Sequence, residues 1–277
     1  MQISISTGTL FVFPLRKNFE MAGKAGFDGL ELIINQDFER INVRDLLRDL
    51  SGIMPILSIH APFMPLFGWG NQVDSLKRSV EFAAEAGVSL VNFHPPSWLG
   101  MEFGLWRWLY RINDFQEEIG QGAVTITLEN MPWKGKHRIN PHILSNTQKM
   151  IEFIEERNLY MTFDTTHMGS GKANFINDFY LCHNSGRIRN IHFSDYGYGR
   201  EHLMPGRGIL PLTRFLNHLR SIDYNHILTL ELSPHEFSRD EDLIMESLAE
   251  ILGYLRKETE QGSAGPQQTS PHQPRTT

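Results

Sequence analysis

The stretch "MTFDTTHMG", residues 161–169, is the starting point for predicting the fold of this chain. It begins as a short apolar segment of the kind that forms a buried strand. It then places Asp164 at the end of that segment and His167 three residues later. A carboxylate adds nothing to the packing of a buried strand, so the pattern becomes informative if other strands of the chain end in the same way.

Short apolar runs rich in Ile, Val, Leu and Phe recur along the chain and alternate with helical patterns. We predict strands at 3–7, 29–34, 54–60, 90–94, 124–129, 160–164, 188–193 and 227–232, and helices that include 75–87, 146–158 and 212–222. Gly87 is a C-terminal stop signal and Asn146 is an N-cap candidate. Eight strands alternating with helices favour the α/β class and a single closed (β/α)8 TIM barrel over an open doubly wound sheet.

The predicted barrel domain covers residues 1–258, and the segment 259–277 differs from it in composition. This last segment is rich in Gln, Pro, Ser, Thr and Gly and has almost no apolar side chains to bury, so we predict a disordered C-terminal tail. The charges of Glu260 and Arg275 cancel within it. The barrel therefore carries the whole formal net charge of −6.

Composition and charge narrow the class of protein. A net charge of −6 disfavours binding to nucleic acid, which requires a basic surface. The N-terminus shows no signal peptide and no apolar run approaches the ~20 residues of a membrane span, so we expect a cytoplasmic protein without membrane contact. The single cysteine, Cys182, cannot form an internal disulfide or a thiolate zinc cluster, and its context predicts a buried helical position.

Ionisable side chains stand at the ends of six predicted strands. In chain order they are His60, His94, Glu129, Asp164, His192 and Glu231, with separations of 34, 35, 35, 28 and 39 residues. Each separation is about one βα unit, and the carboxyl ends of barrel strands meet at one mouth, where the active sites of such barrels lie. Glu31 and Asp195 are further candidates. Other histidines are predicted to be structural or solvated: His137, His142, His183, His218, His226, His235 and His272.

The residue types indicate a metal site. Imidazoles and carboxylates without thiolates suit Mn, Zn, Co, Fe or Mg. Three carboxylates packed together without a cation would be strongly destabilised by repulsion and desolvation. We therefore predict a divalent metal site, with the number of ions left open, and no organic cofactor; the main ligands are four residues, Glu129, Asp164, His192 and Glu231. His60 and His94 are candidates for a second metal or for substrate binding.

Tryptophans near the predicted strand ends favour a carbohydrate substrate. Trp98 and Trp133 both follow such ends, and the faces of aromatic rings stack well on the C–H surfaces of sugars. An alternative is that these side chains only pack their loops against the barrel.

Taken together, these segments resemble the xylose-isomerase-like TIM-barrel superfamily. It contains sugar phosphate isomerases and epimerases, inosose dehydratase, and endonuclease IV of the AP endonuclease 2 family. The resemblance covers residues 1–255, and its motifs are "GFDGLEL" (26–32), "SIHAPF" (58–63), "VNFHPP" (91–96), "TLENMP" (127–132), "FDTTHMG" (163–169), "IHFSD" (191–195), "HLMPGRG" (202–208) and "LELSP" (230–234).

Resemblance to the ketose epimerases implies specific roles. Their single Mn or similar ion is held by Glu, Asp, His and Glu from strands five to eight, which match the four predicted ligands. By this resemblance Glu129 and Glu231 are catalytic and exchange the proton on opposite faces of the substrate carbon, while His167 and Arg200 contact substrate. The resemblance implies a divalent-metal-dependent sugar or sugar-phosphate isomerase or epimerase that moves a proton next to a carbonyl through a metal-stabilised enediolate.

Resemblance to endonuclease IV implies an alternative, a zinc phosphodiesterase acting on abasic DNA. That enzyme adds metal ligands that match His60, His94, His167 and His202. Its third metal also requires an aspartate where this chain has Arg200, which is a departure from the pattern. A lyase of the inosose dehydratase type and a barrel without catalytic activity are further alternatives. The sequence leaves open whether the protein is a monomer or a homo-oligomer.

Overall fold

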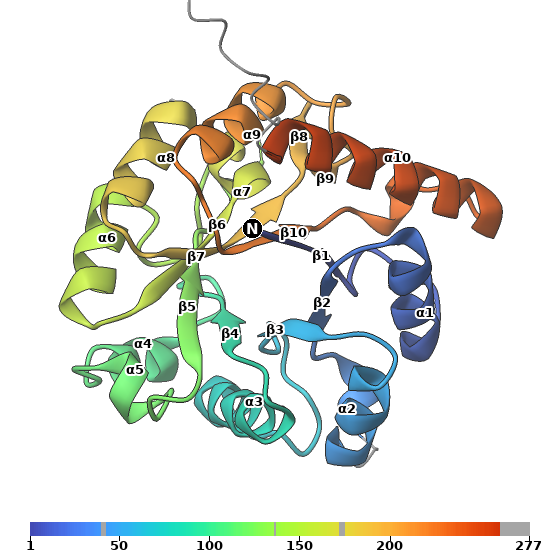
Figure 1. The fold of residues 1–277 in the computed structure, drawn as a ribbon. Coiled ribbons are helices and arrows are strands. Elements are labelled where there is room, and N and C mark those ends of the chain that lie inside the picture. The colour runs from blue at the N-terminus through green and yellow to red at the C-terminus, as the bar shows by residue number, and fades with distance from the viewer. Residues whose placement is uncertain (40–42, 136, 172–174, 261–277) are drawn as a thin grey trace, which may run out of the picture.

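The computed structural model describes residues 1–39, 43–135, 137–171 and 175–260 of the 277 residues. Within these ranges, eight parallel strands close into a barrel in the order β1-β10-β7-β6-β5-β4-β3-β2. The major helices surround this ring of strands (Figure 1). The predicted α/β class and single (β/α)8 barrel are therefore confirmed.

Each barrel strand overlaps a predicted strand. The barrel strands are β1 (Gln2–Ser6), β2 (Gly29–Ile33), β3 (Ile56–His60), β4 (Leu90–Phe93), β5 (Thr125–Glu129), β6 (Tyr160–Asp164), β7 (Ile188–Phe193) and β10 (Ile227–Leu230). The helices are α1 (Leu15–Ala25), α2 (Val43–Ser51), α3 (Gln72–Ala86), α4 (Phe103–Leu109), α5 (Phe115–Glu118), α6 (Thr147–Glu156), α7 (Thr165–Ser170), α8 (Phe175–Asn184), α9 (Leu212–Ser221) and α10 (Glu241–Thr259), with 3-10 turns η1 (Gln36–Glu39) and η2 (Pro234–Glu236).

The predicted helix signals act as expected. Gly87 ends α3 in the left-handed conformation, with φ of 71°, and Asn146 caps α6 by accepting a hydrogen bond from the backbone of Lys149. Helix α10 extends to Thr259, and positions 261–277 of the predicted tail lie outside the described residues. None of the helices in the described part of the chain is both long and apolar enough to cross a membrane.

Two short features were not predicted. The antiparallel hairpin of β8 (Asp195–Gly197) and β9 (Arg200–Leu203) follows β7, and the short helix α7 begins directly after β6. Neither is long enough to show the periodic pattern of apolar residues from which helices and strands are predicted. Both lie at the carboxyl ends of the strands, where they contribute to the mouth of the barrel.

The strands alternate between apolar and polar side chains, and strand β5, with the sequence TITLE, shows this most clearly. Ile126 and Leu128 belong to the apolar core shared with the helices, whereas Thr127 and Glu129 make polar contacts. Every barrel strand contributes a fully buried polar residue one to three positions before its carboxyl end. We call these residues the inner polar set: Ser4, Glu31, Ser58, Asn92, Thr127, Thr162, Asn190 and Thr229.

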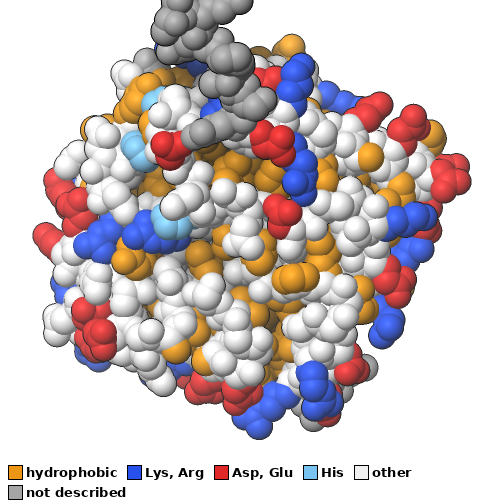
Figure 2. Space-filling view, viewed as in Figure 1, with side chains coloured by type: hydrophobic (Ala, Val, Ile, Leu, Met, Phe, Trp, Pro, Cys, Tyr) orange, Lys and Arg blue, Asp and Glu red, His pale blue; other side chains and the backbone are white. Residues whose placement is uncertain are grey.

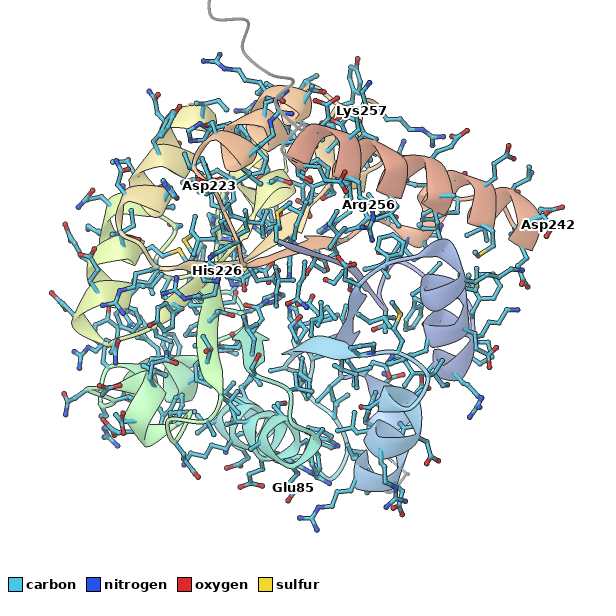
Figure 3. All side chains as sticks on the ribbon, in the orientation of Figure 1. Glu85, Asp223, His226, Asp242, Arg256 and Lys257 are labelled. Atoms are coloured by element: carbon cyan, nitrogen blue, oxygen red, sulfur yellow. The ribbon has the colours of Figure 1, made fainter. Side chains whose placement is uncertain are left out.

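The apolar core thus lies between strands and helices, and side chains fill the ring of strands (Figure 3). On the face seen in Figure 2, acidic and basic side chains are mixed around the periphery, over the helices. Glu85 and Asp242 lie at this periphery, whereas His226, which directly precedes β10, lies at the ring of strands (Figure 3). His226 is therefore at the opposite end of the barrel from the carboxyl ends of the strands.

Candidate metal centre and active site

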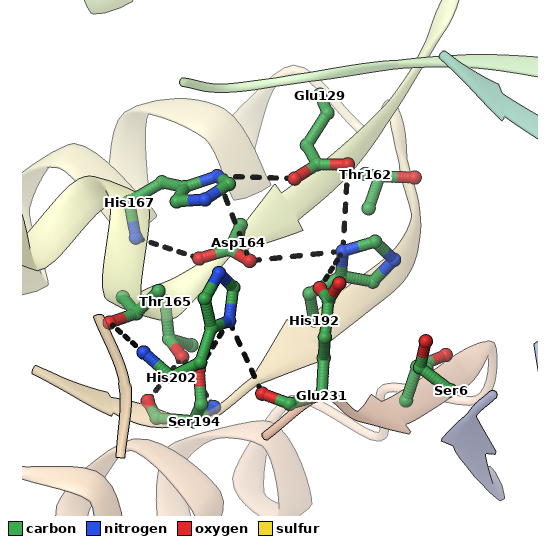
Figure 4. A network of polar contacts seen from close by, with 12 residues as sticks. Ser6, Glu129, Thr162, Asp164, Thr165, His167, His192, Ser194, His202 and Glu231 are labelled. Atoms are coloured by element: carbon green, nitrogen blue, oxygen red, sulfur yellow. Dashed lines mark hydrogen bonds and ion pairs between the residues drawn. The ribbon is translucent and has the colours of Figure 1, made fainter. Parts of the chain in front are cut away.

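Four predicted ligands converge at the mouth of the barrel (Figure 4). Glu129 and Asp164 end β5 and β6, His192 lies in β7, and Glu231 directly follows β10. One potential ligand atom from each of the four lies within 4.8 Å of the others. The side chains of the first three are buried, and Glu231 is 17% exposed, so the group reaches solvent mainly on the Glu231 side.

The imidazole of His192 lies among the three carboxylates. Its Nδ1 is 2.8 Å from Glu231 Oε2, 3.5 Å from Glu129 Oε2 and 3.8 Å from Asp164 Oδ2. Apart from these ion-pair contacts, the buried atoms His192 Nδ1, Asp164 Oδ2 and Glu231 Oε2 make no hydrogen bond of normal geometry to any described residue. Buried polar atoms normally have partners, and these three are the atom types that bind divalent metals. The residues present therefore fit a metal ion.

The charges of the four groups are strongly coupled. Although burial opposes it, the pKa of His192 is raised well above its usual range by Glu31, Glu231 and Glu129. Burial likewise acts against ionisation of Glu129, but His192 and His94 hold the pKa of that carboxyl well below its usual value. Without a metal, an imidazolium partly neutralises the carboxylates. A divalent cation would take over that role.

The two carboxylate oxygens of Asp164 make different contacts. Helix α7 begins directly after it, and Oδ1 accepts a hydrogen bond of 2.7 Å from the backbone N–H of His167. This is the contact of an N-cap with the third residue of the helix, so the Asp-x-x-His spacing follows from helix geometry. Oδ2 is left to face the metal-ligand group. Burial raises the pKa of Asp164 to about 6.

His167 faces Glu129 across the strand ends. Its Nδ1 lies 2.9 Å from the backbone carbonyl of Asn130, to which it can donate, and 3.1 Å from Glu129 Oε1. Burial opposes protonation, but Asp164 and Glu129 raise the pKa of His167 to about 9. The imidazole is therefore a cationic donor beside a catalytic candidate.

A second group of potential ligands shares Glu129. One atom each of His60, His94 and Glu129 lie within 4.8 Å of one another. His60 Nδ1 is 2.8 Å from the carbonyl of Ala61, which can only accept, so a neutral His60 directs its Nε2 lone pair at His94 Nε2, 3.1 Å away. Burial lowers the pKa of His94 to about 4, which favours the neutral imidazole that a metal requires.

His202 forms a third group with Asp164 and His167. It adopts the left-handed conformation, with φ of 55°, which costs a non-glycine residue about 1 kcal/mol or more. Its backbone N–H donates to Thr166 Oγ1 at 3.2 Å, and its Nδ1 lies 3.3 Å from the carbonyl of Glu231. These contacts hold the imidazole at the mouth.

Arg200, a predicted substrate ligand, pairs with another residue. Its guanidinium donates to the buried carboxylate of Glu236 at 2.7 Å, and Arg207 lies 3.2 Å from the same carboxylate. Contact between Arg200 and substrate stays a prediction, and it requires the arginine to share or leave this ion pair.

The two predicted substrate tryptophans differ in position. Trp133 and His167 both line a pocket of about 550 Å³ that extends to residues of α6 and α8 and is lined by none of the four predicted metal ligands. Trp98 is 46% exposed, and its indole N–H donates to the carbonyl of Asn140 at 3.3 Å, which joins the loops after β4 and β5. Trp98 thus connects two loops, and contact of either tryptophan with substrate stays a prediction.

Several supporting residues were not predicted. Asn92 of the inner polar set donates to Glu129 Oε2, and the side chain of Asn130 exchanges two hydrogen bonds with the backbone of Asp164. Asn92 could have been found from sequence, because each of the six residues predicted at strand ends follows a polar residue two positions earlier. This i, i+2 relation is plain in pairs such as Asn190 with His192.

Comparison with known proteins places this geometry in context. The model of the protein family described as xylose isomerase-like TIM barrel matches residues 19–257 of this chain. An uncharacterized protein of Mycobacterium leprae (strain TN) is 28% identical over 91% of this chain and 98% of its own length. An uncharacterized protein of Mycobacterium tuberculosis (strain ATCC 25618 / H37Rv) is 26% identical over 92% of this chain and 97% of its own.

Solved structures share the fold at lower identity. A D-tagatose 3-epimerase-like protein superimposes with a TM-score of 0.68 at 21% identity, over 94% of this chain and 100% of its own. The IOLI protein with a bound zinc atom superimposes with a TM-score of 0.68 at 16% identity, over 93% of this chain and 99% of its own. An AP endonuclease of family 2 from Brucella melitensis superimposes with a TM-score of 0.67 at 13% identity, over 88% of this chain and 96% of its own.

Proposed function

Because the chain belongs to the xylose isomerase-like TIM-barrel family, we propose that it is a divalent-metal-dependent isomerase or epimerase of a sugar or sugar phosphate. One observation carries this proposal. The ligand atoms of Glu129, Asp164, His192 and Glu231 gather within 4.8 Å, and three of these side chains direct buried atoms without hydrogen-bond partners into the group. The epimerase-like and zinc-bound structural neighbours agree with it.

The four residues Glu129, Asp164, His192 and Glu231 would hold the metal. A bound divalent cation would supply the positive charge that offsets negative charge on substrate oxygens when a proton leaves the adjacent carbon. Mn, Zn, Co and Mg all suit this ligand set of one imidazole and three carboxylates.

The chain's own residues would move the proton. Glu129 on β5 and Glu231 after β10 lie three strands apart around the mouth, so a substrate carbon between them would face one carboxylate on each side. The pKa values of both are lowered despite burial, mainly by His192, which keeps the carboxylates ionised as bases. Protonated His167, beside Glu129, would donate a hydrogen bond to a substrate oxygen.

A test of this function measures proton exchange directly. The metal-loaded protein is incubated in D₂O with a panel of ketoses, their phosphates and inositol-derived ketones, and deuterium at the carbon next to the carbonyl is followed by NMR. We expect exchange with at least one member, and its loss in Glu129→Gln. Exchange that continues unchanged in Glu129→Gln contradicts the assigned role. Water release during exchange would identify the lyase form of the same chemistry.

A second candidate function is hydrolysis of phosphodiesters at abasic sites in DNA. The observation that favours it is the neighbouring group of His60, His94 and Glu129, which offers ligands for another metal ion. This function predicts two or three zinc ions per chain and nicking of a duplex that contains an abasic site. The epimerase-type function predicts about one metal ion per chain and no nicking.

A further inference from the structure

Glu31 in β2 is the one carboxylate of the inner polar set, and it lies behind the metal-ligand group. It is fully buried. Ser58 Oγ donates to its Oε2 at 2.8 Å, and Asn190 Nδ2 donates to the same oxygen at 3.1 Å. His192 presents its Nε2 to this carboxylate, 3.2 Å from Oε2 and 3.0 Å from Oε1.

We propose that Glu31 is a positioning residue for His192, which fixes the imidazole so that Nδ1 is the atom available to a metal. The proposal rests on the proposed function in one respect, namely that a metal binds the group of Glu129, Asp164, His192 and Glu231.

The chemistry of the imidazole supports this role. A neutral imidazole carries one N–H, and a carboxylate beside one ring nitrogen selects the tautomer in which that nitrogen is the donor. Nδ1 lies 2.8 to 3.8 Å from the carboxylates, so when a metal replaces the proton there, Glu31 beside Nε2 would keep the remaining proton on Nε2. Nδ1 is the ring atom that has no hydrogen-bond partner.

The strands fix the position of Glu31. The pairing of β2 with β3 shifts register between Leu30 and Glu31, and an irregularity of this kind re-aims the side chain beside it. Strands β2 and β7 are not neighbours in the barrel, so the contact between Glu31 and His192 crosses the interior. Donors from β3 and β7 then hold the carboxylate in place.

The energetic argument points the same way. A fully buried carboxylate without a cation is strongly unfavourable, yet the described residues place no Lys or Arg in hydrogen-bond or ion-pair contact with Glu31. Its charged partner is His192. With a metal bound at Nδ1, the Nε2–H of His192 would remain the donor to Glu31. Loss of an outer carboxylate of this kind typically weakens metal binding by about 10–100-fold.

The first experiment measures zinc affinity by competition with a chelator in three proteins. Glu31→Gln keeps size and an acceptor oxygen but removes the charge. Ser79→Ala is the control, because Ser79 is as fully buried as Glu31 but lies in α3, where its hydroxyl donates to the backbone carbonyl of Ser75. We expect a roughly 10–100-fold higher zinc dissociation constant for Glu31→Gln and less than about a twofold change for Ser79→Ala. Equal affinities for Glu31→Gln and the unaltered protein overturn the proposal.

The second experiment needs no variant. In the zinc-loaded protein with ¹⁵N-labelled histidine, NMR shows whether the proton of His192 is on Nε2, as we expect. A proton on Nδ1 with zinc on Nε2 overturns the proposal even if Glu31→Gln fails to fold. Failure of the proposed function gives a different result, since the unaltered protein would then bind zinc without catalysing exchange. If the unaltered protein binds no zinc at this group, both proposals are overturned.

Discussion

Asp164 caps helix α7 through one carboxylate oxygen, which accepts the backbone N–H of His167 at 2.7 Å, while its other oxygen faces His192 at 3.8 Å. A single side chain thus joins the local structure of the strand–helix turn to the candidate metal site. The two contacts involve different oxygens, so substitutions can separate them.

Asp164→Asn should keep the cap and remove the metal ligand, because asparagine is as good an N-cap as aspartate. We expect zinc affinity to fall at least about 100-fold, since a charged ligand is lost. The metal-free variant should be at least as stable as the metal-free parent, because burial raises the pKa of this carboxyl to about 6 and its charge is unfavourable at neutral pH.

Asp164→Ala is the companion variant, because it removes both the ligand and the cap. It should be about 1 kcal/mol less stable than Asp164→Asn without metal, as measured by chemical denaturation. If the two variants have the same stability, the capping bond contributes nothing and the account of the Asp-x-x-His spacing is wrong.

Glu129→Gln tests the assigned base. The substitution keeps the shape of the side chain but removes its ability to accept a proton, so turnover on an identified substrate should fall about 10²–10⁴-fold. The melting temperature of the variant should stay within a few degrees of the parent. Glu81→Gln, on the exposed surface of α3, is the control and should retain full activity.

Metal affinity should depend on pH in two regimes. His192, whose pKa is raised well above its usual range, must release a proton on binding, so the dissociation constant should fall about tenfold per pH unit between pH 6 and 8. Below pH 6 Asp164 is also protonated, because its pKa is raised to about 6, and the dependence should steepen. Titration calorimetry in buffers of different ionisation enthalpy measures the protons released. A dissociation constant that does not change between pH 5 and 8 would contradict both assignments.

Asp195 supports the loop that follows β9 and should matter for stability. Its two carboxylate oxygens accept four backbone N–H groups, at 2.8 to 3.0 Å, from Tyr196, Gly206, Gly208 and Leu210. Asp195→Asn turns an amide N–H₂ toward two of these donors, so we expect a loss of about 2 kcal/mol in the free energy of unfolding. Asp49→Asn, an exposed position on α2, is the control, and an equal effect at both positions would refute this reading of the loop.

The sequence predicted the barrel because each buried strand is a short apolar run between helical patterns. The convergence of Glu129, Asp164, His192 and Glu231 also followed from position, since the carboxyl ends of barrel strands meet at one mouth. Their roles as ligands and catalytic groups remain predictions for the experiments above.

Other features of the site depend on contacts between distant strands and on local backbone conformation, which the pattern of each strand alone does not predict. Glu31 was only a candidate for the ligand group, and the structure places it on the far side of His192. That contact joins residues 161 positions apart and depends on a register shift in β2. The β8–β9 hairpin and the left-handed backbone conformation of His202 were not predicted, because neither gives a periodic pattern of apolar residues.

The central claim is that this barrel holds a catalytic divalent metal. The most direct test is elemental mass spectrometry of protein purified without a His tag or added metal, repeated after reconstitution with Mn, Zn, Co or Mg. The account predicts about one metal ion per chain, which is lost in Asp164→Asn. The absence of bound metal even after reconstitution would contradict it.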